Sequence, residues 1–260
     1  MTNKQRLDLI EKYIREHKYA DLHTLADKFD ISLSTVRRAL NELEAANIIC
    51  RHHGGASLVE EDTSSTGYDF ITQDNRQTEQ KHAIARKMAE LIEPGMTVML
   101  DGGTSTYTVA RALVEKRLVV ITNSLPIAAL FGEVGSSETI VTGGTVYSRL
   151  GILYGPACEQ AINRVHVDIA VCGCAGMTPE GIWNNNSFIA SFQQHMINVC
   201  DQLYFVMDST KMGKRALSLV TELSDKFTII TDKEPPAEIA EPAAKAGTRI
   251  IVAPPSRIES

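Results

Sequence analysis

Residues 32–43 read SLSTVRRALNEL, and this short stretch decides the fold of the N-terminal part of the chain. Ser32 is a good N-cap, and the apolar residues after it recur at helical spacing, so the stretch predicts a short helix. Its apolar stripe faces a core, which leaves a set of polar residues outside the stripe near the helix N-terminus. They are Ser34, Thr35, Arg37, Arg38 and Asn41. The helix therefore offers hydroxyl, guanidinium and amide groups to a partner.

The residues on either side place this helix in a helix-turn-helix. Residues 3–17 carry apolar residues at helical spacing, and residues 22–29 predict a second, shorter helix capped by Asp21. Residues 48–58 read as a short hairpin with a polar tip, which completes a winged helix-turn-helix. Three residues of the hairpin are candidates for contact with the DNA backbone or a minor groove: Arg51, His52 and His53.

The side chains of the third helix suit the major groove of DNA. Arginine can clamp a guanine edge or a phosphate, hydroxyl groups reach phosphates or bases, and a helix N-terminus favours a phosphate. Double-stranded operator DNA is the predicted partner, and two-fold operators favour a homo-dimer or tetramer. The alternative is a protein-binding winged helix with an incidental pair of arginines.

From residue 81 onward, helices alternate with short apolar strands, which indicates a mostly parallel sheet covered on both faces. The helices are predicted at 81–92 and 105–115, and the strands at 96–101, 118–122, 139–142, 167–174, 203–207, 227–231 and 249–253. Residues 59–75 are polar and lack periodicity. We therefore predict an α/β chain with a winged helix-turn-helix at 1–58, a linker at 59–75 and an α/β effector-binding domain at 76–255.

The charge of this 260-residue chain is unevenly distributed. Residues 1–58 hold nine Lys and Arg against eight Asp and Glu, and residues 59–260 hold 17 against 24, so a charge of −7 on the second part accounts for the net charge of −6. A near-neutral domain can still bind DNA when its cations share one face. No apolar run approaches the ~20 residues that span a bilayer, and the N-terminus lacks the apolar core of a signal peptide. We expect a cytoplasmic protein without a membrane partner.

The five cysteines are odd in number and scattered, so no disulfide framework is expected. Cys172 and Cys174 lie two apart in a predicted strand and point to the same face. We expect them to be small buried hydrophobes rather than a reactive or metal-binding pair. No metal site and no cofactor are predicted.

The segment after the first predicted strand of the second domain has the composition of an anion cradle. Glycines let a ligand approach the backbone closely, while hydroxyls and the N–H groups of a helix start bind an anion. The segment opens a helix and reads Asp101-Gly102-Gly103-Thr104-Ser105-Thr106. A plain turn with a helix cap is the alternative. Apart from Gly102, each of these residues is a candidate effector contact.

Polar residues also follow other predicted strands, and in open α/β sheets ligands bind at the carboxyl ends of strands. Asn123 follows the strand at 118–122, and Lys211 follows the strand at 203–207. Lys211 is the natural partner for a phosphate charge, and Arg149 is a second candidate. For each of these two cations, a solvated surface position is the alternative.

The N-terminal motif resembles the bacterial DeoR-type regulators. The resemblance covers residues 4–58, above all the stretch at 34–43 and the sequence RHHGGA at 51–56. Most members have an acidic residue after the paired arginines, where this chain has Ala39. Alanine suits the core stripe there, and whatever the acidic residue does to orient an arginine is lost.

Residues 76–254 resemble the sensor domain of the same family, which shares the fold of ribose-5-phosphate isomerase and sugar-phosphate deaminases. The resemblance implies a phosphorylated sugar or related metabolite as the effector. Seven residues occupy matching motif positions: Asp101, Thr104, Ser105, Thr106, Asn123, Arg149 and Lys211. Members usually carry acidic and basic residues where residues 183–195 of this chain read WNNNSFIASFQQH, without a carboxylate. We expect altered ligand chemistry on that side of the pocket.

These features favour a metabolite-responsive transcription regulator that represses carbohydrate-metabolism genes. The main alternative is a sugar-phosphate isomerase or deaminase with an appended DNA-binding module. Isomerisation needs a base, for which Asp101 and Asp208 are available. The lack of carboxylates at 183–195 argues against catalysis, so we expect no enzyme activity. A structural adaptor that binds neither ligand nor DNA is a third alternative.

Overall fold

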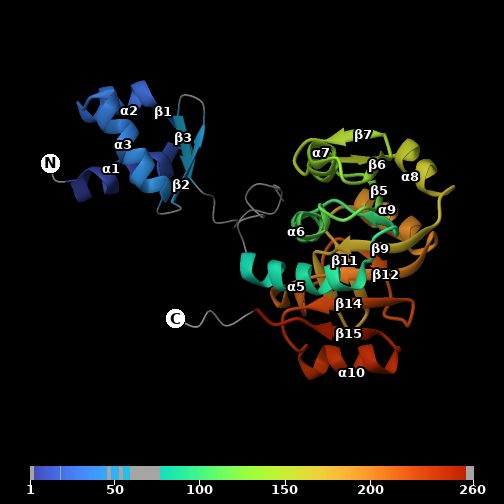
Figure 1. Ribbon diagram of the computed structural model, residues 1–260. Coiled ribbons are helices and arrows are strands. Elements are labelled where there is room, and N and C mark those ends of the chain that lie inside the picture. Colours follow the sequence, from blue (N-terminus) through green and yellow to red (C-terminus); the bar gives the residue numbers. More distant parts are fainter. Residues whose placement is uncertain (1–2, 18, 46–47, 53–54, 59–76, 256–260) are drawn as a thin grey trace. The chain divides into compact units, whose positions relative to one another are not determined.

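The computed structural model describes residues 3–17, 19–45, 48–52, 55–58 and 77–255. The chain divides into two compact units, residues 1–66 and 67–260 (Figure 1). The predicted linker at 59–75 lies outside the described residues, so the domain boundaries on either side of it remain predictions. None of the helices in the described ranges has the length and apolar character needed to cross a membrane.

The N-terminal unit is a winged helix-turn-helix, as predicted. Its elements are α1 (Asn3–His17), β1 (Tyr19–Asp21), α2 (Leu22–Phe29), α3 (Leu33–Ala45), β2 (Ile49–His52) and β3 (Gly55–Leu58). The strands form an antiparallel sheet in the order β1-β3-β2. The caps form where expected, because Asp21 Oδ1 accepts from Thr24 N at 2.9 Å and Ser32 Oγ accepts from Thr35 N at 3.2 Å.

This unit has a hydrophobic core of its own. Ile10 and Ile14 of α1, Leu25 of α2 and Val36 and Leu40 of α3 are fully buried against one another. Burial of each such side chain contributes about 1.5–3 kcal/mol relative to exposure. The apolar stripes predicted from the sequence are thus what holds the three helices together.

The C-terminal unit is built on a seven-stranded parallel sheet in the order β15-β14-β12-β9-β4-β5-β6. The strands are β4 (Thr97–Leu100), β5 (Val119–Thr122), β6 (Glu138–Val141), β9 (Val167–Gly173), β12 (Cys200–Val206), β14 (Phe227–Thr231) and β15 (Arg249–Val252). Each corresponds to a strand expected from the sequence, within a few residues at either end.

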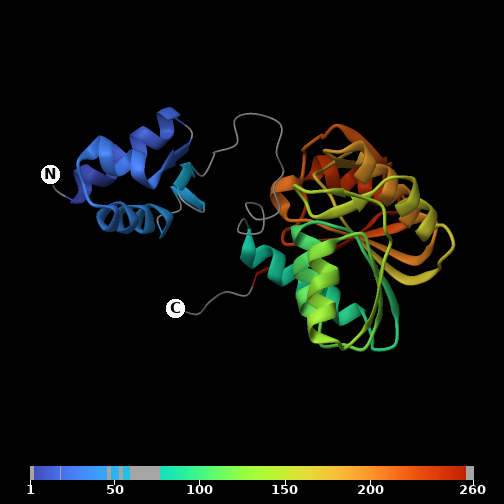
Figure 2. The same cartoon turned by 90° about the horizontal axis from the view of Figure 1, so that it is seen from above.

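Helices cover both faces of this sheet (Figures 1 and 2). One layer contains α5 (Thr78–Leu91), α6 (Thr104–Leu113) and α7 (Leu125–Val134), and the other contains α8 (Pro156–Ile162), α9 (Ser187–Ile197) and α10 (Ala237–Lys245). Alternation along β4 serves both layers, because Val98 and Leu100 pack into the first and Met99 packs into the second. The predicted fold class is therefore confirmed.

Several short elements were not expected from the sequence. They are the hairpin of β7 (Thr145–Tyr147) and β8 (Ile152–Tyr154), the small antiparallel sheet of β10 (Gly176–Thr178), β11 (Gly181–Asn184) and β13 (Ser218–Thr221), and the 3-10 turn η1 (Ser209–Lys211). Each has only three or four residues, too few to show a period. β10 and β11 follow the carboxyl end of β9, and η1 follows that of β12, so these elements surround one edge of the main sheet.

Candidate functional site

The helix α3 separates a buried stripe from a polar face. Val36 and Leu40 are fully buried and Ala39 is 2% exposed, so position 39 belongs to the core, as expected. Of the predicted DNA contacts on this helix, Thr35 is half-buried and the others are exposed: Ser34, Arg37, Arg38 and Asn41. The hydroxyl of Ser32 lies 2.8 Å from the hydroxyls of both Ser34 and Thr35. A polar surface with two guanidinium groups is therefore presented by one helix.

The structure describes only the backbone of two of the three DNA contacts predicted in the wing. Arg51 and His52 belong to β2, whose backbone pairs with β3, but their side chains lie outside the described part of the chain, as does all of His53. Their contact with DNA stays a prediction.

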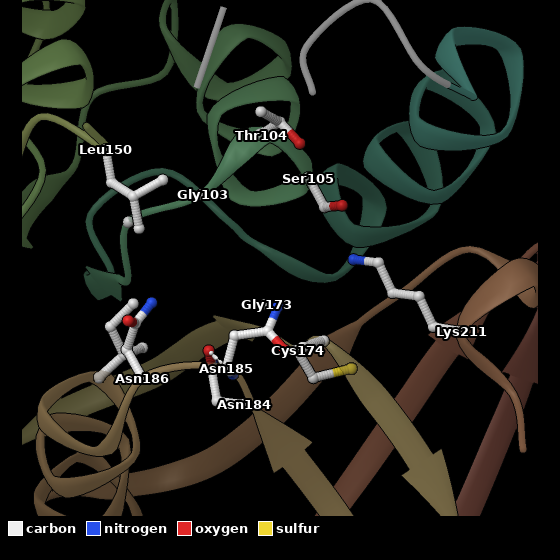
Figure 3. Close-up of a pocket in the computed structure, with 13 residues that line it drawn as sticks. Gly103, Thr104, Ser105, Leu150, Gly173, Cys174, Asn184, Asn185, Asn186 and Lys211 are labelled. Atoms are coloured by element: carbon white, nitrogen blue, oxygen red, sulfur yellow. Dashed lines mark hydrogen bonds between the residues drawn. The ribbon is translucent and has the colours of Figure 1, made fainter. Parts of the chain in front are cut away.

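A pocket opens at the carboxyl ends of β4, β9 and β12 (Figure 3), the edge at which parallel α/β sheets bind ligands. Its lining includes four predicted effector contacts: Gly103, Thr104, Ser105 and Lys211. The remaining lining residues are Gly102, Leu150, Gly173, Cys174, Ala175, Asn184, Asn185, Asn186 and Ile189. Segments far apart in the sequence thus converge on one site.

One side of the pocket is the N-terminus of α6. Gly103 is the N-cap residue with φ of +149°, which favours glycine, and no side chain caps the helix. Ser105 is 4% exposed, and its Oγ has no hydrogen-bond partner among the described residues. In Figure 3 this hydroxyl faces the space into which the Lys211 amine also points. A buried polar atom without a partner is costly, so the Ser105 hydroxyl is suited to contact a bound ligand.

Lys211 reaches the pocket from the turn η1 that follows β12. Asp208 Oδ1 accepts a hydrogen bond from Thr210 N at 3.1 Å and so caps this turn. Gly213 N donates to Met177 O at 2.8 Å, which ties the segment after Lys211 to β10. Next to Met177, Gly176 must lack a side chain, since a Cβ there would lie 2.0 Å from Lys214 O. The backbone from which the Lys211 side chain extends is therefore held in place on both sides.

Amide side chains form the opposite side of the pocket and continue into the protein interior. Asn184 Oδ1 accepts from Asn185 N at 2.8 Å, and Asn184 Nδ2 donates to Gln193 Oε1 at 3.3 Å. Gln193 Nε2 then donates to Asp101 Oδ2 at 2.6 Å and to Gly173 O at 2.7 Å. A chain of side-chain hydrogen bonds thus joins the asparagines to Asp101.

Asp101 lies beneath the pocket rather than on its surface. It is fully buried, and its Oδ1 accepts from Gly102 N at 2.7 Å. Burial raises the pKa of Asp101 to about 7, against the opposing effect of the hydrogen bonds from Gln193 and Gly102, which stabilise the charged form. Asp101 therefore supports the cradle through the Gly102 backbone.

The other predicted effector residues lie outside the pocket lining. Thr106 is buried and donates its hydroxyl to Gly103 O at 2.9 Å. Asn123 is buried, accepts from Gly102 N at 3.1 Å and donates to Leu153 O at 3.2 Å. Both residues therefore hold the backbone of the anion cradle by hydrogen bonds to its glycines. Arg149 is exposed and does not line the pocket.

Comparison with known proteins gives two matches to family descriptions. The "DeoR-like helix-turn-helix domain" matches residues 6–62, and the "DeoR C terminal sensor domain" matches residues 76–233, more than half of the chain. The chain belongs to the DeoR family. It is accordingly a transcription regulator with a DNA-binding domain and a sensor domain, and the pocket lies in the sensor domain.

Relatives of this DeoR-family regulator include both activators and repressors. The L-fucose operon activator of Haemophilus influenzae is 32% identical over 233 residues, which cover 89% of this chain and 92% of the relative. The glycerol-3-phosphate regulon repressor of Escherichia coli is 31% identical over 249 residues, which cover 93% and 95%. A solved ribose 5-phosphate isomerase A from Methanocaldococcus jannaschii has a TM-score of 0.38 and 15% identity over 51% of this chain and 53% of its own.

Sequence reasoning missed several residues of the DeoR sensor pocket. Leu150 and Ile189 supply apolar lining, and Cys174 lies 6% exposed at its edge with a thiol pKa raised to about 11 by burial. The cysteine is thus a buried small side chain, as expected for it. Asn184 to Asn186 could be recognised only as a departure from the family pattern. No signal marked Gln193, whose partner Asp101 is distant in sequence.

Proposed function

We propose that this regulator is a metabolite-responsive repressor of carbohydrate-metabolism genes, with a phosphorylated sugar or related metabolite as its effector. The observation that carries the proposal is the buried, unpartnered Oγ of Ser105 at the N-terminus of α6, facing the same space as Lys211. The helix N-terminus favours an anion, the hydroxyl hydrogen-bonds it, and the ammonium group supplies a positive charge. A phosphate group meets all three requirements.

DNA recognition is assigned to the exposed face of α3. In this proposal Arg37 and Arg38 contact bases or phosphates of the major groove, with Ser34, Thr35 and Asn41 beside them. The wing residues Arg51, His52 and His53 contact the backbone or a minor groove. The regulator acts as a homo-dimer or tetramer on two-fold operators, and it works in the cytoplasm because operator DNA is its partner.

The proposed effector is bound and not converted. No carboxylate is present among the described residues that line the pocket. Asp101 is fully buried with both oxygens accepting hydrogen bonds, and Asp208 is buried and caps its own turn. Neither is placed to take a proton from a ligand, which argues against the isomerase or deaminase alternative.

Thermal unfolding of the full chain with a panel of sugar and polyol phosphates tests this proposal. At 100 times its Kd an effector stabilises the fold by about 2.7 kcal/mol, which is visible as a rise in Tm. Lys211→Ala and Ser105→Ala should weaken binding, by roughly tenfold to a hundredfold for the lysine, because a charge-assisted contact is lost. Lys214→Ala removes an exposed cation from the same segment and serves as the control.

The outcomes separate the alternatives. Operator release or tightening by the compound that raises Tm, without its conversion, supports the proposal. Conversion of that compound would support the enzyme alternative. A Tm that no phosphorylated compound moves, or an equal response of Lys211→Ala and Lys214→Ala, contradicts the assignment of the pocket.

A further inference from the structure

The side of the pocket opposite the anion cradle is built from uncharged amides. Asn184, Asn185 and Asn186 line it, and Figure 3 shows them on the side of the pocket opposite Thr104 and Ser105. Asn186 is the N-cap residue of α9, yet its side chain makes no capping hydrogen bond. Among the described residues that line the pocket, Lys211 alone carries a charge.

The carboxylate of Asp101 is held beneath the pocket by a hydrogen-bond chain whose direction is fixed at both ends. Asn185 N–H can only donate, so Asn184 must turn its Oδ1 toward it and its Nδ2 toward Gln193. Gly173 O can only accept, so Gln193 turns its Nε2 inward. Asp101 Oδ2 receives the remaining hydrogen of Gln193, and Asp101 Oδ1 receives Gly102 N–H. The carboxylate of Asp101 is therefore not one of the groups that line the pocket.

This arrangement distinguishes a hydroxyl from an ammonium group on the ligand. A hydroxyl both donates and accepts, and so matches the oxygen and nitrogen of an amide side chain. An ammonium group only donates and carries a positive charge, which is costly to bury without a carboxylate and is repelled by Lys211. We propose that the pocket selects phosphorylated, hydroxyl-bearing sugars or polyols and rejects the matching amino compounds. The inference rests on the proposed function, whose phosphate site it keeps.

The test compares ligand pairs that differ by one group. The pairs are sn-glycerol 3-phosphate with 2-aminopropane-1,3-diol monophosphate, glucose 6-phosphate with glucosamine 6-phosphate, and galactose 6-phosphate with galactosamine 6-phosphate. Binding to the full chain is measured by calorimetry near neutral pH. In each pair that binds, we expect the amino compound to bind roughly tenfold to a hundredfold more weakly, the range set by an uncompensated buried charge.

Asn186→Asp gives a second measurement at the amide side of the pocket. The substitution is isosteric, and aspartate is a favoured N-cap residue, so the fold should be retained. A carboxylate at position 186 should shift the ratio of the two Kd values toward the amino compound by about tenfold or more. Asn163→Asp is the matched control, because it adds the same charge at the C-cap of α8, outside the pocket lining, and should leave the ratio unchanged.

Each result has a definite meaning. Weaker binding of the amino compounds, with a shift of the Kd ratio toward them in Asn186→Asp only, supports the inference. Equal or tighter binding of the amino compounds by the natural chain overturns the inference while the proposed phosphate site stands. Failure of every compound in all three pairs to bind overturns both. A Kd ratio that changes equally in Asn186→Asp and Asn163→Asp would contradict the inference, because the selectivity would then not depend on the asparagines that line the pocket.

Discussion

Gln193 Nε2 donates a 2.6 Å hydrogen bond to Asp101 Oδ2, across 92 positions of the sequence. The bond joins α9, which follows the three pocket asparagines Asn184, Asn185 and Asn186, to the first residue of the segment that forms the anion cradle. Since Asp101 also accepts from Gly102 N, the two sides of the sensor pocket are connected by one buried hydrogen-bond network. Changes to this network are therefore expected to affect both the stability and the ligand response of the domain.

Removal of the Gln193 amide should destabilise the sensor domain. In Gln193→Leu the buried carboxylate of Asp101 loses its side-chain donor, which should lower the free energy of unfolding by about 1.5–3 kcal/mol. Urea denaturation measures this change. Gln194→Leu is the control, since Gln194 is exposed and donates to the backbone carbonyls of Leu219 and Val220, at 3.4 and 3.1 Å, rather than to a buried carboxylate. Equal losses in the two variants would contradict a special role of Gln193.

The raised pKa of Asp101 predicts a pH dependence of stability. Its folded pKa of about 7 exceeds the ordinary aspartate value of 3.8, so between these pH values the folded chain holds a proton that the unfolded chain has released. Stability from this residue is thus fully present below pH 4 and falls as the pH rises toward 7, by up to about 4 kcal/mol. Unfolding of the natural chain and of Asp101→Asn, followed from pH 5 to 7.5, should show a steeper loss in the natural chain. Parallel curves would exclude Asp101 as the source.

The anion cradle could be predicted from the sequence, whereas the amide side of the pocket could not, because only the cradle is formed by consecutive residues. Gly103, Thr104 and Ser105 are consecutive, and a strand-to-helix connection fixes their geometry locally. Asn184 meets Gln193, and Gln193 meets Asp101, only because α9 packs against the main sheet. Such contacts depend on tertiary packing, which a residue pattern does not specify.

Long strands could likewise be predicted from the sequence, whereas short strands could not. The strands of the main sheet were predictable because buried parallel strands read as continuous apolar runs. The short β1 pairs with β3 across the N-terminal unit, and that pairing rather than a sequence period identifies it as a strand. Arg149 was a candidate by its charge alone, and its place in the turn between β7 and β8 leaves it exposed.

The two units should work separately. A chain that begins at residue 76 retains both layers of the main sheet, and the described core residues of the winged helix all lie between Leu7 and Ala56. We expect this fragment to fold, to keep the rise in Tm with the effector and to lose operator binding. Circular dichroism, thermal unfolding and a gel-shift assay measure these properties. An unfolded fragment would mean that the sensor domain requires residues before 76.

The exposed arginines of α3 give the last prediction, which concerns DNA. If Arg37 or Arg38 reads a guanine, its replacement by alanine should cost about 1–3 kcal/mol on the operator and relax the preference at that base. If the arginine contacts a phosphate, affinity should fall on all sequences and the slope of log K against log salt should flatten by about one unit. Titration of operator and unrelated DNA at several salt concentrations separates the two cases.

A matched control is needed because any lost cation weakens DNA binding in general. Lys12 is an exposed cation on α1, so Lys12→Ala removes the same charge from a different helix. Specific recognition by α3 predicts a larger loss for Arg37→Ala or Arg38→Ala than for Lys12→Ala on the operator. Natural affinity in both arginine variants, or equal losses in all three, would remove α3 as the reading helix. Because Val36, Ala39 and Leu40 hold α3 in the core, these surface substitutions should leave the Tm unchanged, so a change in binding reports on the contact itself.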